Sequence, residues 1–215
     1  MSWLRSVFAH GGAALWTLVR LLTGWLLPRA SGQIMLNSAA RTSIVLLGCM
    51  VGLAAEAQTP PSESAVMAGF VYNFGKFVEW PEGTLAARSA INLCLLGSTQ
   101  ELGDFAAVHG RIAQGYPLQV SYPTRGEELR RCNILFIARS EKGRLRETLR
   151  AVEGRSILTI SNVDGFVDDG GIIGLITRGG KVQFSINLAV SRLAKLKVSS
   201  QLLRLAQDVK EGESN

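Results

Sequence analysis

The segment Ile91-Asn92-Leu93-Cys94-Leu95-Leu96 is a nearly continuous apolar run, and Gly97 closes it. A short apolar run bounded by a turn residue is typical of a β-strand that is buried on both faces. Residues 100–108, after the glycine, have the pattern of a helix. The sequence therefore predicts a strand followed by a helix, which is the opening unit of a parallel sheet.

The same alternation of strand and helix continues through the middle of the chain. Further short strands are predicted over 118–122, 133–137 and 156–160. Between them lie a charged helical turn at 127–131 and a helix at 141–152 with a basic outer face. Because strands that alternate with helices form βαβ units, we expect a mainly parallel sheet with helices on both faces.

The last third of the chain departs from this alternation. Two strands over 171–177 and 181–186 are joined through Arg178-Gly179-Gly180, a glycine turn suited to a hairpin. An antiparallel hairpin on an otherwise parallel sheet is a common mixed arrangement. The predicted fold class is therefore α/β, a three-layer sandwich with a mainly parallel mixed sheet and a C-terminal antiparallel hairpin.

Helices are predicted at both ends of this domain. Ser62 and Glu63 form the cap and first turn of a helix that Trp80-Pro81 ends, because proline disfavours the helical conformation in the residue before it. At the other end, a helix over 188–196 is interrupted by Lys197-Val198, and Ser199 or Ser200 caps a last helix that runs to residue 207. Apolar residues at helical spacing mark the first helix: Val66, Met67, Phe70, Val71, Phe74, Phe77 and Val78.

Residues 35–57 contain the parts of a secretory signal peptide. Arg41 precedes an apolar run over 44–54, and Ala55-Glu56-Ala57 is a signal-peptidase site that leaves Gln58 as the new N-terminus. The run is shorter than the ~20 residues that a membrane-spanning helix needs. We therefore predict an export segment over 1–57 with cleavage between Ala57 and Gln58, and a single periplasmic domain over 58–215.

Two alternatives for the export segment stay open. Translation from Met35 would place the signal at the N-terminus; otherwise residues 3–27 form an upstream amphipathic or membrane-associated helix. Leu46-Leu47-Gly48-Cys49 also fits a lipobox, which would make the protein a lipoprotein.

The charge and the cysteines have to be counted for the mature chain. The full sequence carries 23 Lys and Arg against 17 Asp and Glu, a formal net charge of +6, and cleavage after Ala57 leaves +3. The basic character thus belongs partly to the export segment and does not indicate nucleic-acid binding.

Cys94 and Cys132 are the cysteines that remain after cleavage. In an oxidising compartment they are candidates for one disulfide, with two buried free thiols as the alternative.

The chemistry-bearing residues form no reaction centre in the sequence. His109 is the sole histidine after Gln58, and neither a nucleophile elbow nor closely paired zinc ligands accompany it. Gly97-Ser98-Thr99 and Gly179-Gly180-Lys181 lack the spacing of phosphate-binding loops. Asp164, Asp168 and Asp169 lie in a glycine-rich loop, where they are expected to be solvated turn residues. The sequence predicts no catalytic site, no metal site and no cofactor.

Two blocks of sequence resemble the YfiR-like family of periplasmic regulators. The first is the aromatic helix over 69–81, GFVYNFGKFVEWP. The second comprises Gly170-Gly171-Ile172-Ile173-Gly174, the strand VQFSIN over 182–187 and LKVSSQLLRLA over 196–206. The resemblance extends over about residues 62–207, and it is the order and spacing of the blocks that make it specific.

This resemblance implies a function that composition alone does not. YfiR-like regulators repress a membrane-bound diguanylate cyclase by binding its periplasmic sensory part, and so limit cyclic di-GMP signalling and biofilm formation. The resemblance also implies a homodimer, an outer-membrane lipoprotein that sequesters the repressor, and a disulfide between Cys94 and Cys132. Better-known members carry a second cysteine pair that this chain lacks, so we expect the disulfide to be structural.

Four residues are candidates for contact with the partner: Trp80, Asp168, Asp169 and Arg178. Tryptophan is enriched at binding hot spots, although a tryptophan before a proline at a helix end is equally suited to packing.

The alternative function is a periplasmic small-ligand-binding module, with its pocket at the C-terminal ends of the parallel strands.

Overall fold

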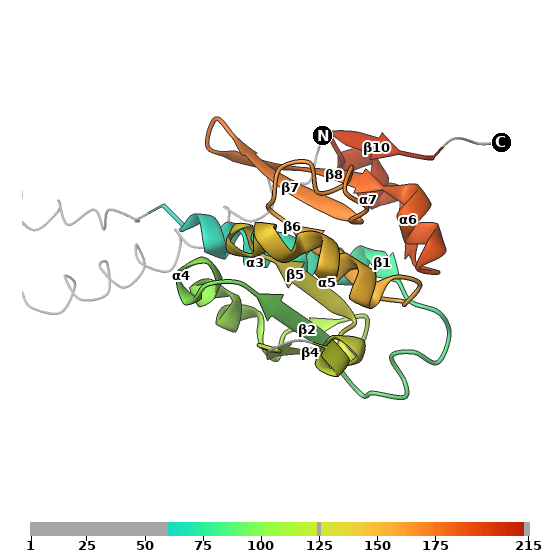
Figure 1. Cartoon of the computed structure of the whole chain (residues 1–215). Coiled ribbons are helices and arrows are strands. Elements are labelled where there is room, and N and C mark those ends of the chain that lie inside the picture. The colour runs from blue at the N-terminus through green and yellow to red at the C-terminus, as the bar shows by residue number, and fades with distance from the viewer. Residues whose placement is uncertain (1–59, 124–125, 213–215) are drawn as a thin grey trace, which may run out of the picture. The chain divides into compact units, whose positions relative to one another are not determined.

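The computed structural model describes residues 60–123 and 126–212, and it has a mixed eight-stranded sheet at its centre (Figure 1). The strand pairs are parallel except for the β7–β8 and β3–β4 hairpins. The predicted α/β fold class is therefore confirmed. In spatial order the strands are β10 (Asp208–Lys210), β8 (Lys181–Asn187), β7 (Ile173–Arg178), β6 (Leu158–Ser161), β5 (Ile134–Ile137), β2 (Ile91–Leu96), β4 (Tyr116–Ser121) and β3 (Ile112–Ala113).

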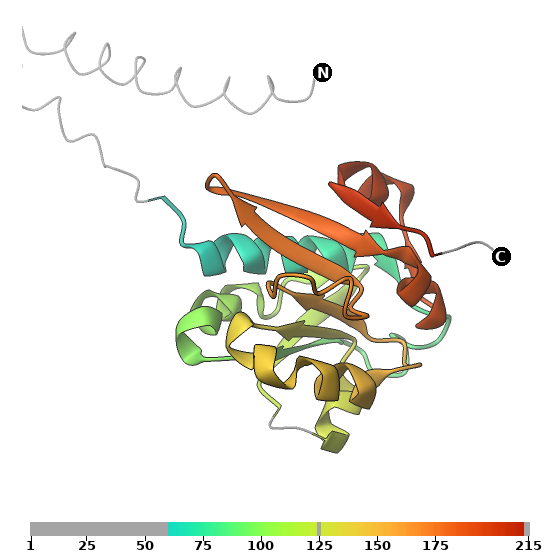
Figure 2. The ribbon, with the colours of Figure 1, turned by 45° about the horizontal axis from the view of Figure 1, so that its top comes forward.

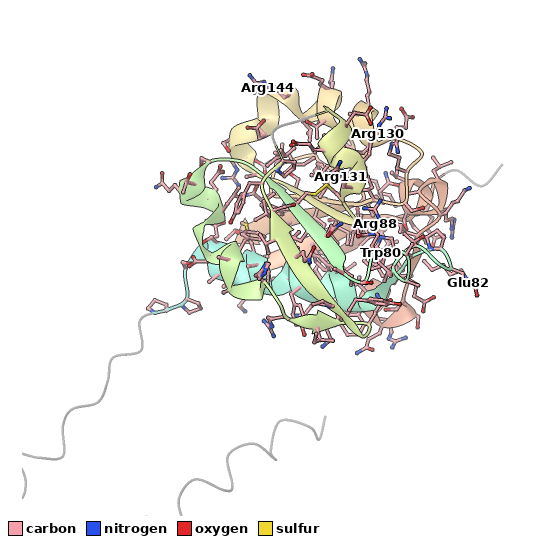
Figure 3. All side chains as sticks on the ribbon, turned by 90° about the horizontal axis from the view of Figure 1, so that it is seen from below. Trp80, Glu82, Arg88, Arg130, Arg131 and Arg144 are labelled. Atoms are coloured by element: carbon pink, nitrogen blue, oxygen red, sulfur yellow. A yellow bond between two sulfur atoms is a disulfide. The ribbon has the colours of Figure 1, made fainter. Side chains whose placement is uncertain are left out.

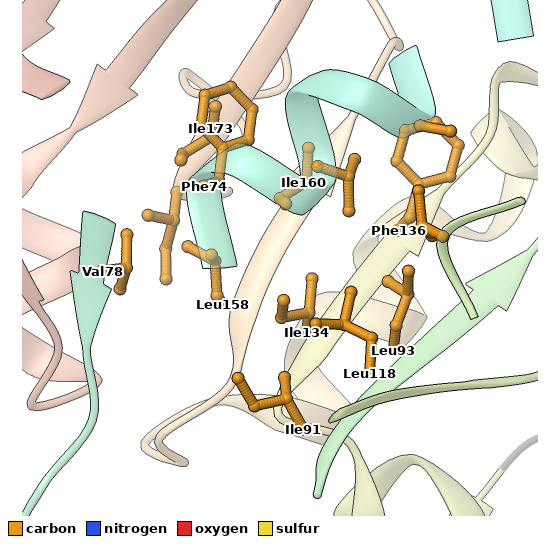
Figure 4. Close-up of a cluster of buried hydrophobic side chains, with 14 of the residues drawn as sticks. Phe74, Val78, Ile91, Leu93, Leu118, Ile134, Phe136, Leu158, Ile160 and Ile173 are labelled. Atoms are coloured by element: carbon orange, nitrogen blue, oxygen red, sulfur yellow. The ribbon is translucent and has the colours of Figure 1, made fainter. Parts of the chain in front are cut away.

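Two layers of helix cover the two faces of this sheet (Figure 2). Helix α3 (Glu63–Phe77) covers one face, and the other face carries α5 (Leu145–Val152) with the 3₁₀ helices η2 (Gly126–Arg131) and η3 (Arg139–Arg144). Side chains of β2 alternate between the two cores, because successive residues of a strand point to opposite faces. Leu93 packs with α3 (Figure 4), whereas Cys94 packs with α5 and η2.

Helix α3 begins as the sequence predicts. The hydroxyl oxygen of Ser62 accepts a hydrogen bond from the Ala65 amide at 3.0 Å, which makes Ser62 the N-cap. The rings of Phe70, Phe74 and Phe184 form an aromatic cluster with centroids 5.1–6.1 Å apart, which attaches the helix to β8.

The end of α3 differs from the prediction. The helix stops at Phe77 rather than at Trp80-Pro81, because Val78 and Glu79 form a short strand, β1, that pairs antiparallel with β9 (Lys197–Val198). The amide of Ser199 donates to the carbonyl of Phe77 at 3.0 Å and extends this link. The two blocks that carry the family resemblance therefore meet in space, and their contact joins the first helix to the C-terminal helices.

The remaining boundaries follow the predicted order with shifts. The helix predicted over 100–108 is a short α-helix, α4 (Thr99–Leu102), followed by the 3₁₀ helix η1 (Gly103–Val108). The helix predicted over 188–196 is α6 (Leu188–Leu193), and it ends earlier because Lys195 has a left-handed φ of 58°. Ser199 caps α7 (Ser200–Leu205), as predicted. The chain then adds β10, a strand that the sequence did not predict.

The β3–β4 hairpin was also not predicted, and its turn forms hydrogen bonds with the C-terminal end of α3. Its turn residues Gln114 and Gly115 have φ values of 50° and 83°. The Gln114 side-chain amide donates to the carbonyls of Gly75 and Val78, each at 2.7 Å. The turn thus satisfies carbonyl groups that the end of a helix leaves without partners.

The signal peptide predicted over 35–57 and the cleavage site at Ala57 and Gln58 lie outside the described residues. Among the described residues, no helix is both long and apolar enough to cross a membrane.

Candidate partner-binding site

The four residues suggested for partner contact do not gather in one place. Trp80 is buried with 9% of its surface exposed, and its indole N–H has no hydrogen-bond partner among the described residues. Asp168 forms an ion pair with Lys210, and Asp169 lies 3.9 Å from Arg146. Arg178 lies at the tip of the β7–β8 hairpin, at the opposite end of β7 from the two aspartates. The role of each in partner contact stays a prediction.

The aspartates belong to a loop between β6 and β7 that is packed tightly against the sheet. Phe166, within this loop, is 1% exposed. A Cβ on Gly171 would lie 2.1 Å from Cε1 of the Phe166 ring, so only glycine fits at position 171. The loop is therefore held in one conformation, with Asp168 and Asp169 at its surface.

Asn187 connects this loop to helix α6. Its side-chain oxygen accepts from the amide of Val190 at 3.0 Å and caps the helix, while its side-chain NH₂ donates to the carbonyl of Val167 at 2.9 Å. The Asn187 backbone amide donates to the carbonyl of Ile172, and the Ile172 amide donates to the Thr159 hydroxyl. These bonds position the start of α6 relative to β6 and β7.

A hollow of about 350 Å³ lies between α5, the start of β6, the β6–β7 loop and α6. Its inner wall is apolar and includes Val152, Ile157, Ile172 and Ala194, each of them less than 9% exposed. Leu193 lies on its rim with 73% of its surface exposed, more than any other large apolar residue in the described part of the chain. An apolar hollow with an exposed leucine at its edge has the character of a hot-spot pocket.

Charged side chains surround the apolar wall. Arg146, Arg150 and Arg155 line the hollow from the α5 side, with Glu153 and Asp169 as the acidic members. The Arg146–Asp169 pair is long and its arginine side chain is 82% exposed, so this pair contributes little stability. Within the described chain, the side chains of Arg150 and Arg155 make no ion pair. The rim therefore favours a partner that brings a carboxylate beside an apolar side chain.

This hollow is not at the place that the ligand-binding alternative predicts. It lies at the amino ends of β6 and β7, whereas a smaller hollow of about 280 Å³ lies at the carboxyl ends of β2 and β4. Gly97, Thr99, Leu102, Gly103 and Tyr122 line the smaller one. A third hollow, of about 320 Å³, also borders the carboxyl end of β4 at Ser121 and Tyr122, so the hollows at the carboxyl ends are both smaller than the one between α5 and α6.

Two carboxylates with lowered pKa values lie near this second region and near α3, away from the larger hollow. Partial burial acts to raise the pKa of Glu101, but hydrogen bonds from Ser140 and Ser98 outweigh it and lower the pKa. Hydrogen bonds from the hydroxyls of Ser62 and Ser64 lower the pKa of Asp104. Glu101 thus links the start of α4 to the start of η3, and Asp104 links η1 to the first turn of α3.

Cys94 and Cys132 are joined by a disulfide, with their Cα atoms 5.7 Å apart. Cys94 lies in β2 and Cys132 directly before β5, and these strands are parallel neighbours in the sheet. Both cysteines are 2% exposed. The bridge ties η2 to the sheet on the face that α5 also covers.

The described residues contain no group of three or more His, Cys, Asp and Glu side chains that could hold a metal ion. The ring nitrogen Nδ1 of His109 accepts a hydrogen bond from the amide of Val120 at 3.2 Å. His109 therefore supports the turn before β3.

Residues 64–207 match the protein family described as YfiR/HmsC-like. Among solved structures, the chain is similar to the crystal structure of a conserved domain protein from Vibrio cholerae O1 biovar eltor str. N16961, with 9% sequence identity and a TM-score of 0.44. The similarity covers 71% of this chain and 62% of that chain, so it spans less than two thirds of the Vibrio protein. No curated protein matches the sequence.

Proposed function

The chain belongs to the YfiR/HmsC-like family of periplasmic regulators of diguanylate cyclases, and on this basis we propose that it represses a membrane-bound diguanylate cyclase. Repression acts through contact with the periplasmic sensory part of the cyclase and limits cyclic di-GMP made in the cytoplasm. The observation that carries the proposal is the family match over residues 64–207, which includes α3, most of the central sheet and the C-terminal helices.

A periplasmic location after removal of the signal peptide is part of this proposal. Disulfides persist in oxidising compartments such as the bacterial periplasm, and the Cys94–Cys132 bridge suits that setting. The proposal also includes a homodimer and an outer-membrane lipoprotein that binds the repressor, as the family resemblance implies.

We assign the contact with the cyclase to the hollow between α5 and α6. Hot spots in protein interfaces consist of a buried apolar anchor surrounded by polar contacts that exclude water. The hollow offers an apolar wall, the exposed Leu193 and an arginine rim. A large apolar side chain of the cyclase with a carboxylate beside it fits this arrangement.

The second candidate function is a small-ligand-binding module, with its pocket in this hollow rather than at the carboxyl ends of the parallel strands. Small-molecule sites commonly enclose roughly 300–1,000 Å³, and this hollow measures about 350 Å³. The genes beside this one separate the two functions: a diguanylate cyclase with a periplasmic sensor supports repression, and a transporter or receptor operon supports ligand binding.

Replacing Leu193 by glutamate is expected to weaken binding to the cyclase's periplasmic part by at least about thirtyfold, as for a hot-spot residue. The substitution removes the apolar rim and places a carboxylate where the partner's own carboxylate would lie. Isothermal titration calorimetry with the purified periplasmic part measures the effect.

Leu205→Glu is the matched control. Leu205 is also exposed, at 66%, and lies at the end of α7 rather than at the hollow. We expect this variant to bind like the wild type. Equal losses for both variants, or no loss for Leu193→Glu in a folded protein, would remove the hollow from the interface.

A further inference from the structure

The positive charge of the domain is concentrated on one helical layer. Residues 126–155, which contain η2, η3 and α5 together with the buried strand β5, carry eight Lys and Arg against five Glu. The other described residues carry ten basic and ten acidic side chains, so they are neutral as a group. Figure 3 shows Arg130, Arg131 and Arg144 on the same side of the sheet.

These cations are exposed and few of them are neutralised. Arg131, Lys142 and Arg144 are all exposed, and the ion pairs found between described residues, Arg130–Glu127, Arg146–Asp169 and Lys210–Asp168, do not include them. Arg130 is paired with Glu127 at 2.8 Å, and Arg146 only loosely with Asp169. Charges with few partners of opposite sign create a positive potential outside the protein.

Apart from the side of α5 that lines the α5–α6 hollow, the layer lacks the apolar residues that a protein interface needs at its centre. Leu129, Leu145 and Val152 are less than 9% exposed and point to the core. The exposed large apolar residues of the described chain are Ile112, Tyr122, Leu193 and Leu205, and all of them lie outside residues 126–155. Protein interfaces are built around buried apolar anchors, whereas binding to charged lipid headgroups needs only cations at the surface.

We propose that this basic layer, residues 126–155, binds the anionic phosphate headgroups of the membrane in which the cyclase is embedded. The inference rests on the proposed function, because that function brings the domain to a membrane surface. Binding is electrostatic and superficial, since no apolar side chain of the layer is available to enter the lipid. Arg146, Arg150 and Arg155 belong to the rim of the α5–α6 hollow, so we assign the headgroup contact to the cations away from the hollow, among them Arg131, Lys142 and Arg144. Such binding would concentrate the protein at the membrane, and the hollow would make the specific contact.

Sedimentation with lipid vesicles tests the proposal without the cyclase. The mature protein is mixed with vesicles of phosphatidylcholine, or with vesicles in which about a third of the lipid is phosphatidylglycerol. We expect binding only to the anionic vesicles, and its loss at high salt, because the Debye length falls from ~10 Å at 0.1 M to ~3 Å at 1 M. Binding to both kinds of vesicle, or to neither, would overturn the proposal.

A triple variant identifies the surface. Arg131→Gln, Lys142→Gln and Arg144→Gln together should weaken binding by about fivefold per residue, or about a hundredfold in total. The matched control, Lys181→Gln with Arg192→Gln and Lys197→Gln, removes the same charge from exposed residues outside the layer and should bind nearly as the wild type does. Equal losses for the two triple variants would show that net charge alone, and not this layer, is responsible.

The outcomes also separate this inference from the proposed function. If the vesicles are not bound but the cyclase is still repressed, the membrane-binding layer is wrong and the repressor assignment stands. If the first triple variant instead loses binding to the soluble periplasmic part of the cyclase, the layer is a protein interface and the proposal fails.

Discussion

Cys94→Ser is expected to lower the free energy of unfolding by about 3–4 kcal/mol and the melting temperature by roughly 10 °C. The bridge closes a loop between residues 38 positions apart, and in the chain-entropy model its loss frees the unfolded chain by this amount. Thermal unfolding followed by circular dichroism measures the effect under oxidising conditions. Because the bridge is structural in this account, the variant should still bind the cyclase at low temperature.

The double variant Cys94→Ser/Cys132→Ser is the control for the bridge itself. Once the disulfide is gone, replacing the second cysteine should cost little more. A reducing agent should bring the wild type close to the variants and leave the double variant unchanged. Two titratable thiols in the unfolded, unreduced wild type would contradict the bridge, and loss of cyclase binding by a folded Cys94→Ser protein would contradict its purely structural role.

Gly171→Ala should destabilise the protein by about 3 kcal/mol, at the upper end of the usual cost of overpacking a core. The new Cβ would lie 2.1–2.4 Å from three atoms of the Phe166 ring, and a ring that is 1% exposed has no free space into which to move. Because Phe166 anchors the β6–β7 loop, the substitution should also disturb the wall of the hollow. Urea denaturation gives the change in unfolding free energy.

Gly143→Ala provides the comparison for Gly171→Ala. A Cβ at Gly143 meets no atom within 4 Å, so this variant should be as stable as the wild type or slightly more stable. Shortening the ring by Phe166→Leu in the Gly171→Ala background should recover part of the loss, since the two positions are in contact. A Gly171→Ala protein of wild-type stability would show that the loop is packed less tightly than described.

The central sheet could be predicted from the sequence because its strands are short apolar runs bounded by glycine or by charged turns. Ile91–Leu96 and Ile134–Ile137 lie at or within one residue of their predicted limits, since almost every side chain in them is buried. The basic outer face predicted over 141–152 is confirmed by the exposed Lys142, Arg144 and Arg146.

The strands that were missed are those whose pairing depends on distant segments. Val78–Glu79 and Lys197–Val198 are two residues long. The sequence places Val78 on the apolar face of the first helix, and it marks Lys197-Val198 only as a break between two helices. They become strands only because they pair with each other across more than a hundred residues of sequence. Asp208–Lys210 likewise becomes a strand by pairing with the end of β8.

The candidate site was only partly visible in the sequence. Asp169 was among the suggested residues and lines the hollow, but Arg146, Ile157 and Leu193 come from three separate segments of the chain and no linear motif connects them. Leu193 looked like one more apolar residue of a helix, and its exposure depends on where α6 is placed by Asn187. Trp80 could be exposed or packed on sequence grounds, and the structure buries it.

The most direct test of the central claim is the cellular concentration of cyclic di-GMP in a strain that lacks this gene. If the protein represses a diguanylate cyclase, deletion should raise cyclic di-GMP and surface attachment, and expression of the wild-type protein from a plasmid should restore both. Nucleotide extraction with mass spectrometry gives the measurement, with the cyclase verified as present and expressed. An unchanged cyclic di-GMP concentration in that deletion strain would contradict the repressor function.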